Sequence, residues 1–302
     1  NRFPPRRVLV AVDLSAPSLC ALDAAKALAL RWNADLEIMH VESPPMLDAW
    51  VGPGMPVCVP ASAREPGRKI EEKLRRAAAG FPAERVKLRL AHGCPPLALL
   101  ELAVPERADL MVMGTHGYAG LDRLITGSVS EAVLRRAGIP VLVVPERKIV
   151  AGGGRVLAPW NGRPYATRAL RWAREISRSL RSTLDVLYVN EIGKPIEKDE
   201  SLGRRLVAAL GTGSDWMLHK RAGDSREQII SAANSGRYEL VVLSAHRRAF
   251  ASDFVLGSAV ERLLRHSKVP VLAVPSGRSR PRVVRRLAAR VRARRYCFSK
   301  DD

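Results

Sequence analysis

At 302 residues the chain is long enough for two domains of ordinary size, and its apolar fraction of 47% is typical of globular proteins. Its four cysteines form no C-x-x-C pair, and no apolar run reaches the roughly 20 residues of a membrane-spanning helix. These features argue against a disulfide framework, a zinc site and a transmembrane segment, and they favour a cytoplasmic location. The formal net charge of +20 is uneven, since residues 277–302 hold nine Arg, one Lys and two Asp.

Strand and helix patterns alternate through the first half of the chain. Continuously apolar runs predict buried strands, whereas apolar residues at helical spacing, such as Leu22, Ala25 and Leu28, predict helices. A Pro- and Gly-rich stretch at 43–67 predicts a surface loop. In chain order the predicted elements are a strand (7–12), a helix (17–32), a strand (36–41), a helix (64–80), a strand (86–91), a helix (95–106), a strand (109–114), a helix (128–138) and a strand (139–145).

The second half of the chain repeats the sequence of the first. "RVLVAVDLS" at 7–15 returns as "RVLAPWNGR" 148 residues later, and "GSVSEAVLRRAGIPVLVVP" at 127–145 returns as "GSAVERLLRHSKVPVLAVP" 130 residues later. The second copy is therefore 18 residues shorter, and the shortening corresponds to the loop at 43–67. This self-similarity predicts two copies of one folding unit.

Strands that alternate with helices and are apolar throughout predict a parallel sheet covered by helices on both faces. We therefore predict two tandem α/β units, each with five mainly parallel strands. The expected domains are 1–150 and 151–276, joined through the linker "AGGGR" at 151–155 and followed by a basic tail at 277–302. Such sheets bind ligands at the carboxyl ends of their strands, where the strand order reverses.

Glycines gather where a predicted strand leads into a predicted helix. Gly114 and Gly117 flank the start of this loop, and Gly127 followed by Ser128 opens the helix. Backbone amides at a helix N-terminus, in a loop without Cβ atoms, form a cradle for phosphate. Ser128 and Glu131 also fit a capping box, so helix capping alone is the alternative explanation of this serine.

The spacing Gly114-x2-Gly117-x9-Gly127-Ser128 resembles the nucleotide-binding signature of the universal stress protein family, in its ATP-binding subgroup. The first strand "VAVDLS" and the last strand "PVLVVP" look like the same family, and the resemblance covers residues 6–275. It implies a Rossmann-like fold of the adenine nucleotide alpha hydrolase type. It also implies that the last strands of the two units, "IPVLVVP" and "VPVLAVP", pair with each other as the last strands of two subunits do in the family.

The resemblance also assigns roles to residues at matching positions. Asp13 would contact the adenine or the ribose, Val41 would supply a backbone contact to the base, and Met113 and Gly114 would line the nucleoside. For Asp13 the alternative is a turn or capping role before the first helix. The phosphates would carry Mg²⁺ or Mn²⁺ and would be held by Gly117, Gly127, Ser128 and Val129.

The second copy departs from this pattern. Asn161, Ser244 and Arg247 stand where the first copy has an aspartate and two glycines, while Gly257 and Ser258 remain. The side chain of Arg247 obstructs the close backbone approach that a glycine allows, although its charge could instead reach a phosphate. We expect a degenerate second site that preserves the fold, and one ATP per chain.

The family resemblance implies an ATP-binding stress-response regulator that acts through nucleotide-dependent conformation or partner binding. The implied partners are adenine nucleotide, a regulatory protein and a second copy of the chain in a homodimer. No nucleophile–base pair follows from the spacing of the residues, so slow hydrolysis of ATP is the most that we expect.

A nucleotide-independent interaction protein is the alternative function. It would bind protein, nucleic acid or an anionic membrane through its basic surface and tail. In the tail, Val284, Leu287 and Val291 fall on one face of a helix with arginines around them, which favours weak binding to polyanions. A solvated extension is the other interpretation of this segment.

Overall fold

Both halves of the chain alternate strand and helix, as the sequence predicts. The computed structural model describes residues 3–42, 67–115, 128–146, 150, 152–191, 193, 199–213, 215–245, 247–250, 253–256 and 258–276, without the side chains of 128, 247–250, 253–256 and 258. The first half contains β1 (Arg7–Ala11), α1 (Ala16–Arg31), β2 (Asp35–Glu42), α2 (Gly67–Ala77), β3 (Val86–His92), α3 (Pro95–Leu102), β4 (Leu110–Gly114), α4 (Ser128–Arg136) and β5 (Val141–Val144). The second half contains β6 (Arg155–Pro159), α5 (Pro164–Leu180), β7 (Thr183–Asn190), α6 (Asp199–Leu210), β8 (Trp216–Ala222), α7 (Ser225–Ala233), β9 (Leu240–Ala245), β10 (Arg247–Phe250), β11 (Asp253–Leu256), α8 (Ser258–His266) and β12 (Val271–Pro275).

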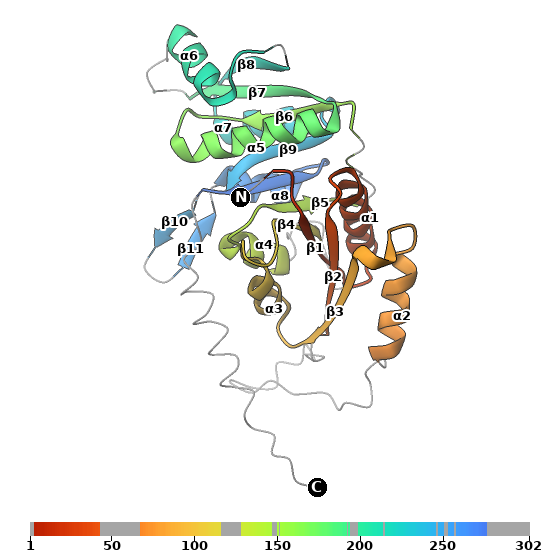
Figure 1. Ribbon diagram of the computed structural model, residues 1–302. Helices are drawn as coiled ribbons and strands as arrows, with labels where there is room; N and C mark the ends of the chain where they lie inside the picture. The colour runs from red at the N-terminus through yellow and green to blue at the C-terminus, as the bar shows by residue number, and fades with distance from the viewer. Residues whose placement is uncertain are drawn as a thin grey trace, which may run out of the picture.

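Ten strands form one sheet, in the order β3-β2-β1-β4-β5-β12-β9-β6-β7-β8 (Figure 1). Inside each half the neighbouring strands are parallel, with β1 between β2 and β4, and β6 between β7 and β9. The halves meet at β5 and β12, which pair antiparallel with Leu142 opposite Leu272. The predicted five-stranded units and the predicted pairing of the two last strands are both confirmed.

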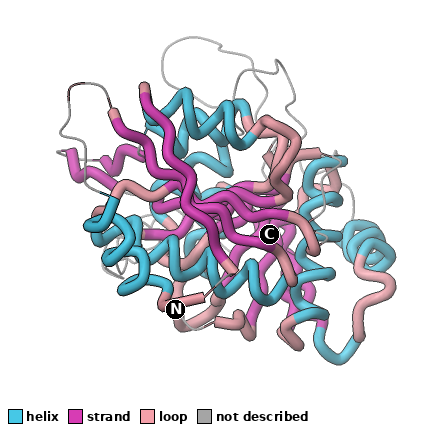
Figure 2. The backbone as a smooth tube through the Cα atoms, turned by 90° about the horizontal axis from the view of Figure 1, so that it is seen from above, coloured by secondary structure: helices cyan, strands magenta, loops and turns pink. Residues whose placement is uncertain are grey.

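Helices cover both faces of this sheet, as Figure 2 shows from above. One face carries α1, α2, α5 and α6 over side chains such as Val8 and Val10, and the other carries α3, α4, α7 and α8 over side chains such as Leu9. Successive residues of a strand point to opposite faces, so a strand that is apolar at every position needs helices on both sides. Each face has one cluster of buried side chains that runs through both halves.

Aromatic side chains join the two halves beyond the shared sheet. The ring of Phe3 lies 5.6 Å from that of Trp32 on one side and 5.5 Å from that of Trp172 on the other, in edge-to-face contacts. Trp32 Nε1 donates a hydrogen bond of 2.5 Å to Ser179 Oγ of α5. The C-terminal end of the first helix of one half therefore contacts that of the other, and this contact adds to the shared sheet in joining the halves.

The second half contains a β-hairpin that stands apart from the main sheet (Figure 1). Its strands β10 and β11 pair antiparallel, with Arg247 opposite Leu256 and Phe250 opposite Asp253. By the repeat, this hairpin occupies the sequence position of residues 117–126 in the first half, which lie outside the described residues. No helix in the described part of the chain is both long and apolar enough to cross a membrane.

Candidate functional site

The strand order reverses at β1, the central strand of the first half. Its neighbours are β2 and β4, and all three strands run in the same direction. Their carboxyl ends bring together Asp13, Val41 and Gly114, which come from different parts of the sequence. A reversal of this kind leaves a crevice beyond the strand ends, because the following segments leave on opposite sides. Three of the residues that the sequence predicts for a ligand site therefore meet at one edge of the sheet.

Asp13 forms the turn that leads from β1 into α1. Its Oδ1 accepts hydrogen bonds from the backbone N–H of Ser15 at 3.0 Å and from Ser15 Oγ at 2.5 Å, and Ser15 is the N-cap of the helix. Within the described residues, Oδ2 takes part in no hydrogen bond. Asp13 therefore has the turn role that the sequence analysis gave as the alternative. This role uses Oδ1 and leaves Oδ2 for another partner.

Gly114 ends β4 directly against the first turn of α1. A Cβ atom at this position would lie 2.8 Å from the carbonyl carbon and oxygen of Pro17 and 3.0 Å from Ser18 N. These are backbone atoms, so they cannot rotate away as the end of a side chain could. The glycine is required because two backbones come close, which explains it before any ligand is considered.

The N-terminus of α1 is closed by its own residues. Pro17 has no N–H, Ser18 N–H lies 3.4 Å from Ser15 Oγ, and Leu19 N–H donates to Ser15 O at 3.0 Å. The first turn of α1 is thus poorly suited to hold phosphate. The helix that follows β4 is α4, and its N-terminus begins at Ser128.

The structure describes some of the remaining predicted residues and not others. Val41 and Val129 are half-buried beside the cluster under α3 and α4. Met113 is 4% exposed within that cluster, so only its backbone lies at the edge of the sheet. Gly117 and Gly127 lie outside the described residues, as does the side chain of Ser128.

The second half builds the same turn with different residues. Asn161 Oδ1 accepts a hydrogen bond of 3.1 Å from Arg163 N–H, and the Asn161 amide donates to Tyr165 Oη at 2.9 Å. Gly162 has a φ of 73°, close to the 66° of Leu14 at the matching position. The backbone of the turn is therefore retained, while the carboxylate charge is lost.

An arginine covers the carboxyl edge of the second half. The guanidinium of Arg205 on α6 lies 5.3 Å from the centre of the Trp160 ring and donates a hydrogen bond to Gly162 O. The ring of Tyr188 lies 6.2 Å from that of Trp160. This cation–π stack lies beside the turn of Asn161, which matches the turn of Asp13 in the first half.

Arg205 is not among the residues that the sequence analysis assigned to a site. The buried Leu202 and Leu206 of α6 match the buried Ile70 and Leu74 of α2, so Arg205 matches Lys73, which is exposed. What distinguishes the two positions is the neighbour: Trp160 offers an aromatic face where the first half has Val12. An aromatic residue at the end of a buried strand was the signal that could have drawn attention to it.

The second half also lacks the glycine-rich loop of the first, because the β10–β11 hairpin stands at that sequence position. The strands β10 and β11 stand at the position of the glycine-rich loop, and their backbone groups pair with each other over four residues of each strand. Amides that are engaged in a hairpin are unavailable to cradle phosphate. Together with the arginine stack, the hairpin makes the second edge unlike the first.

The described residues contain no group of three or more His, Cys, Asp and Glu side chains placed to hold a metal ion. A cation at the first edge would therefore need oxygen ligands from elsewhere, such as the phosphates of a bound nucleotide.

Comparison with known proteins finds relatives that match most of the chain and relatives that match half of it. The model of the universal stress protein family matches residues 5–145 and again 154–275. A universal stress protein of Mycolicibacterium smegmatis is 28% identical over 285 residues, which cover 88% of this chain and 96% of that protein. A universal stress protein of Thermus aquaticus is 35% identical over 150 residues, 46% of this chain and 98% of its own length. The crystal structure of a universal stress protein from Archaeoglobus fulgidus has a TM-score of 0.69 and 21% identity, over 91% of this chain and 100% of that one. With the family model matched twice along most of its length, the chain belongs to the universal stress protein family and carries two of its domains in tandem.

Proposed function

We propose that the chain binds ATP at the carboxyl edge of its first half and acts as a cytoplasmic stress-response regulator whose nucleotide state changes its conformation or its partners. The contrast between the two edges carries this proposal. The first edge keeps a carboxylate oxygen of Asp13 beside Gly114, whereas at the second edge Arg205 stacks on Trp160 and the paired strands β10 and β11 replace the loop. A ligand site that is retained in one copy and closed in the other indicates one nucleotide per chain.

Each residue of the first edge has a chemical role in this proposal. Asp13 Oδ2 accepts a hydrogen bond from a ribose hydroxyl or an adenine amine, and the backbone of Val41 contacts the base. Met113 and Gly114 line the nucleoside with backbone atoms. The N-terminus of α4, with Val129 in its first turn, attracts phosphate through its backbone amides and its dipole. The phosphate-binding group is completed by Gly117, Gly127 and Ser128.

A divalent cation, Mg²⁺ or Mn²⁺, would bind to the phosphates and neutralise part of their charge. The protein residues of the site orient the nucleotide and exclude water from its base. The Ser15 hydroxyl that donates to Asp13 Oδ1 also caps α1. This pair thus has a structural role, and the proposal is regulation by binding and not rapid hydrolysis.

The test is a calorimetric titration of the full chain with ATP, ADP, AMP and a cyclic nucleotide, in the presence of Mg²⁺. We expect one site, with ATP bound most tightly because it carries the longest phosphate chain. Hydrogen exchange with and without ATP should show protection at the start of α1 and α4 and unchanged exchange in β10 and β11. If none of the four nucleotides binds, the chain acts without nucleotide, and the basic interaction protein becomes the better description.

The partners of this regulator are a protein that responds to nucleotide and a second copy of the chain. The last strands β5 and β12 already pair inside one chain, so a homodimer would use a different surface. Sedimentation with and without ATP measures whether two chains associate and whether nucleotide changes that association.

A further inference from the structure

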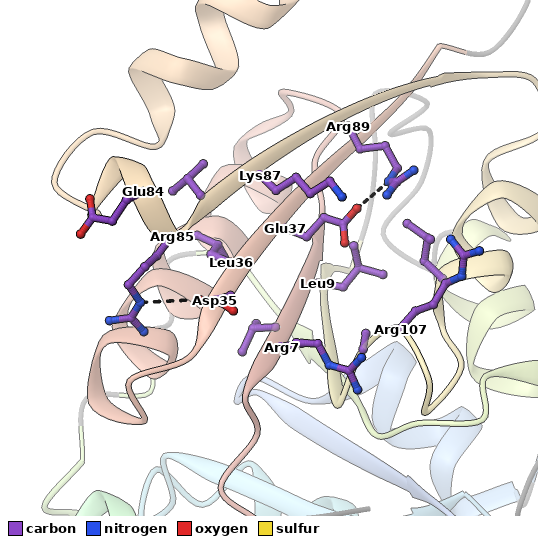
Figure 3. A pocket seen from close by; sticks show the side chains of 14 residues that line it. Arg7, Leu9, Asp35, Leu36, Glu37, Glu84, Arg85, Lys87, Arg89 and Arg107 are labelled. Atoms are coloured by element: carbon purple, nitrogen blue, oxygen red, sulfur yellow. Dashed lines mark hydrogen bonds and ion pairs between the residues drawn. The ribbon is translucent and has the colours of Figure 1, made fainter.

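A cavity of about 460 Å³ lies at the opposite edge of the first half, beside the amino ends of β1, β2 and β3 (Figure 3). Arg7 begins β1 and lines this cavity, whereas Asp13 follows the other end of the same strand. The volume is within the range of small-molecule sites, about 300–1,000 Å³. The cavity is thus separate from the candidate nucleotide site and large enough for a metabolite.

One residue difference explains why the first half has this cavity. In the second half Tyr238 stands at the matching position, and its hydroxyl donates a hydrogen bond of 3.0 Å to the buried Asp185, which Arg155 also holds at 2.7 Å. In the first half that position is Ala108, which lines the cavity. The small side chain leaves open the space that the tyrosine ring fills in the other copy.

The cavity is lined by more positive than negative side chains. Its acidic residues are Asp35, Glu37 and Glu84, and its basic residues are Arg7, Arg85, Lys87, Arg89 and Arg107. Three of the arginines are paired: Arg89 contacts Glu37 at 2.5 Å, Arg7 contacts Asp109 at 3.3 Å and Arg85 contacts Asp35 at 3.8 Å.

Two of the cations differ from the rest. Within the described residues, the side chains of Lys87 and Arg107 form no ion pair and no hydrogen bond, although both line the cavity. Figure 3 shows Lys87 on β3 and Arg107 in the segment after α3, on either side of Glu37 and Leu9. Glu37 uses Oε1 for Arg89, and its Oε2 takes part in no hydrogen bond among the described residues.

We propose that this cavity binds a small metabolite that carries a phosphate monoester and hydroxyl groups, such as a phosphorylated sugar. Lys87 and Arg107 attract the phosphate from the two sides of the cavity, since both are positively charged donors and neither side chain has a carboxylate partner in the described chain. Glu37 Oε2 accepts hydrogen bonds from the hydroxyl groups. Leu9 and Leu102 form the apolar part of the lining. The second half does not repeat this lining, because Tyr238 donates to Asp185, the residue that matches Glu37, and the residue matching Lys87 is Met217.

The experiment measures binding of glucose 6-phosphate, glucose and inorganic phosphate to the full chain by titration calorimetry. We expect glucose 6-phosphate to bind more tightly than either of its parts. The variant Lys87→Ala/Arg107→Ala should bind it at least about tenfold more weakly, the loss expected for charge-assisted hydrogen bonds. Ala108→Tyr should abolish binding although it removes no charge, because it fills the cavity as Tyr238 does in the other half.

Matched controls separate this cavity from the rest of the molecule. Arg237→Ala changes the residue that matches Arg107 in the second half and should leave the affinity unchanged, as should Asp13→Asn at the nucleotide edge. Thermal unfolding of each variant shows that the fold is intact. The proposal is overturned if glucose 6-phosphate does not bind at millimolar concentration, if inorganic phosphate binds as tightly as the ester, or if the double variant keeps the affinity of the parent chain.

Discussion

The last residue of β4, Gly114, lies so close to Pro17 of α1 that a Cβ atom would stand 2.8 Å from the proline carbonyl. Gly114→Ala should therefore destabilise the fold by about 1–3 kcal/mol, the usual cost of forcing an extra carbon into a packed region. It should also weaken ATP binding, since α1 and β4 must separate at the edge where the nucleoside is proposed to lie. Urea unfolding and ATP titration of the variant measure the two effects.

Ser244→Ala is the matched control in the second half. Ser244 already carries a Cβ, and its buried Oγ has no hydrogen-bond partner among the described residues. Removing an unsatisfied buried hydroxyl should be neutral or stabilising. Equal destabilisation by both substitutions would show that the contact with Pro17 is not what requires the glycine.

The fold could be predicted from the sequence because its signals are local and occur twice. Continuous apolar runs predicted buried parallel strands, helical periodicity predicted the covering helices, and the repeat predicted two units. Pairing between β5 and β12 followed from the family resemblance and is confirmed.

The candidate site was predicted only in part. Glycine spacing pointed to the end of β4, but the sequence could not show that Gly114 is needed for its contact with Pro17. The Arg205 stack and the cavity beside Ala108 both depend on which side chains meet across the fold. Such contacts depend on three-dimensional packing between residues far apart in the chain, and no local pattern encodes them.

Asp13→Asn should separate the two roles of this aspartate. An asparagine can accept the same hydrogen bond from Ser15 N–H, as Asn161 does from Arg163 N–H in the second half, so the turn should remain. The substitution removes the negative charge of the carboxylate that is proposed to accept a hydrogen bond from the ribose or the adenine. We expect ATP affinity to fall about tenfold with little change in thermal stability, since hydrogen bonds to charged groups contribute about 1.5–3 kcal/mol.

The reverse change, Asn161→Asp, provides the control. It restores the carboxylate to the second half, yet Arg205 still covers that edge, so no second nucleotide should bind. An unchanged ATP affinity in Asp13→Asn would remove this residue from the proposed site.

Nucleotide stoichiometry tests the difference between the two halves. We expect titration to give one ATP per chain, and we expect Gly117→Arg to abolish binding, because it places in the first half the obstruction that the sequence predicts for Arg247 in the second. Arg247→Gly in the second half serves as the control and should leave one site. Two sites of equal affinity, or normal binding by Gly117→Arg, would contradict the interpretation of the second copy as degenerate.

Acid stability should depend on Asp185, which is fully buried on β7. Burial opposes its ionisation, but hydrogen bonds from Arg155 and Tyr238 and the nearby charge of His219 lower the pKa of Asp185 below its ordinary value. A lowered pKa in the folded chain gives stability that is present above the unfolded pKa of about 3.9 and is lost as the pH falls toward the folded pKa. Asp185→Asn should cost about 3 kcal/mol at neutral pH, because it breaks a buried pair, and this difference should shrink in acid.

Urea unfolding from neutral pH down to about pH 3 measures that difference. Glu37→Gln is the control, since Glu37 holds the matching position in the first half but its side chain is 22% exposed and its partner Arg89 is 34% exposed. Exposed pairs contribute about 1 kcal/mol or less. A difference between the parent chain and Asp185→Asn that stays constant with pH would show that the loss comes from packing and not from the charge.

Polyanion binding by the basic segment 277–302, which lies outside the described residues, is the remaining test of the alternative function. Ten basic residues in a short amphipathic stretch should bind DNA, RNA and anionic vesicles by releasing counterions, so the affinity should fall steeply as salt rises. Removing 277–302 should abolish this salt-sensitive binding. ATP affinity should stay the same, because the proposed nucleotide edge is built from the first half of the chain.

The full and truncated chains are compared on all three polyanions at low and moderate salt, with ATP titration as the internal control. Binding of this kind has no sequence preference, so two DNA duplexes of different sequence should behave alike. If the truncated chain binds the polyanions as well as the full chain, the segment is a solvated extension, and the remaining positive charge of the two halves accounts for the binding. If binding is lost but the dependence on salt is weak, the apolar face formed by Val284, Leu287 and Val291 contributes more than charge does.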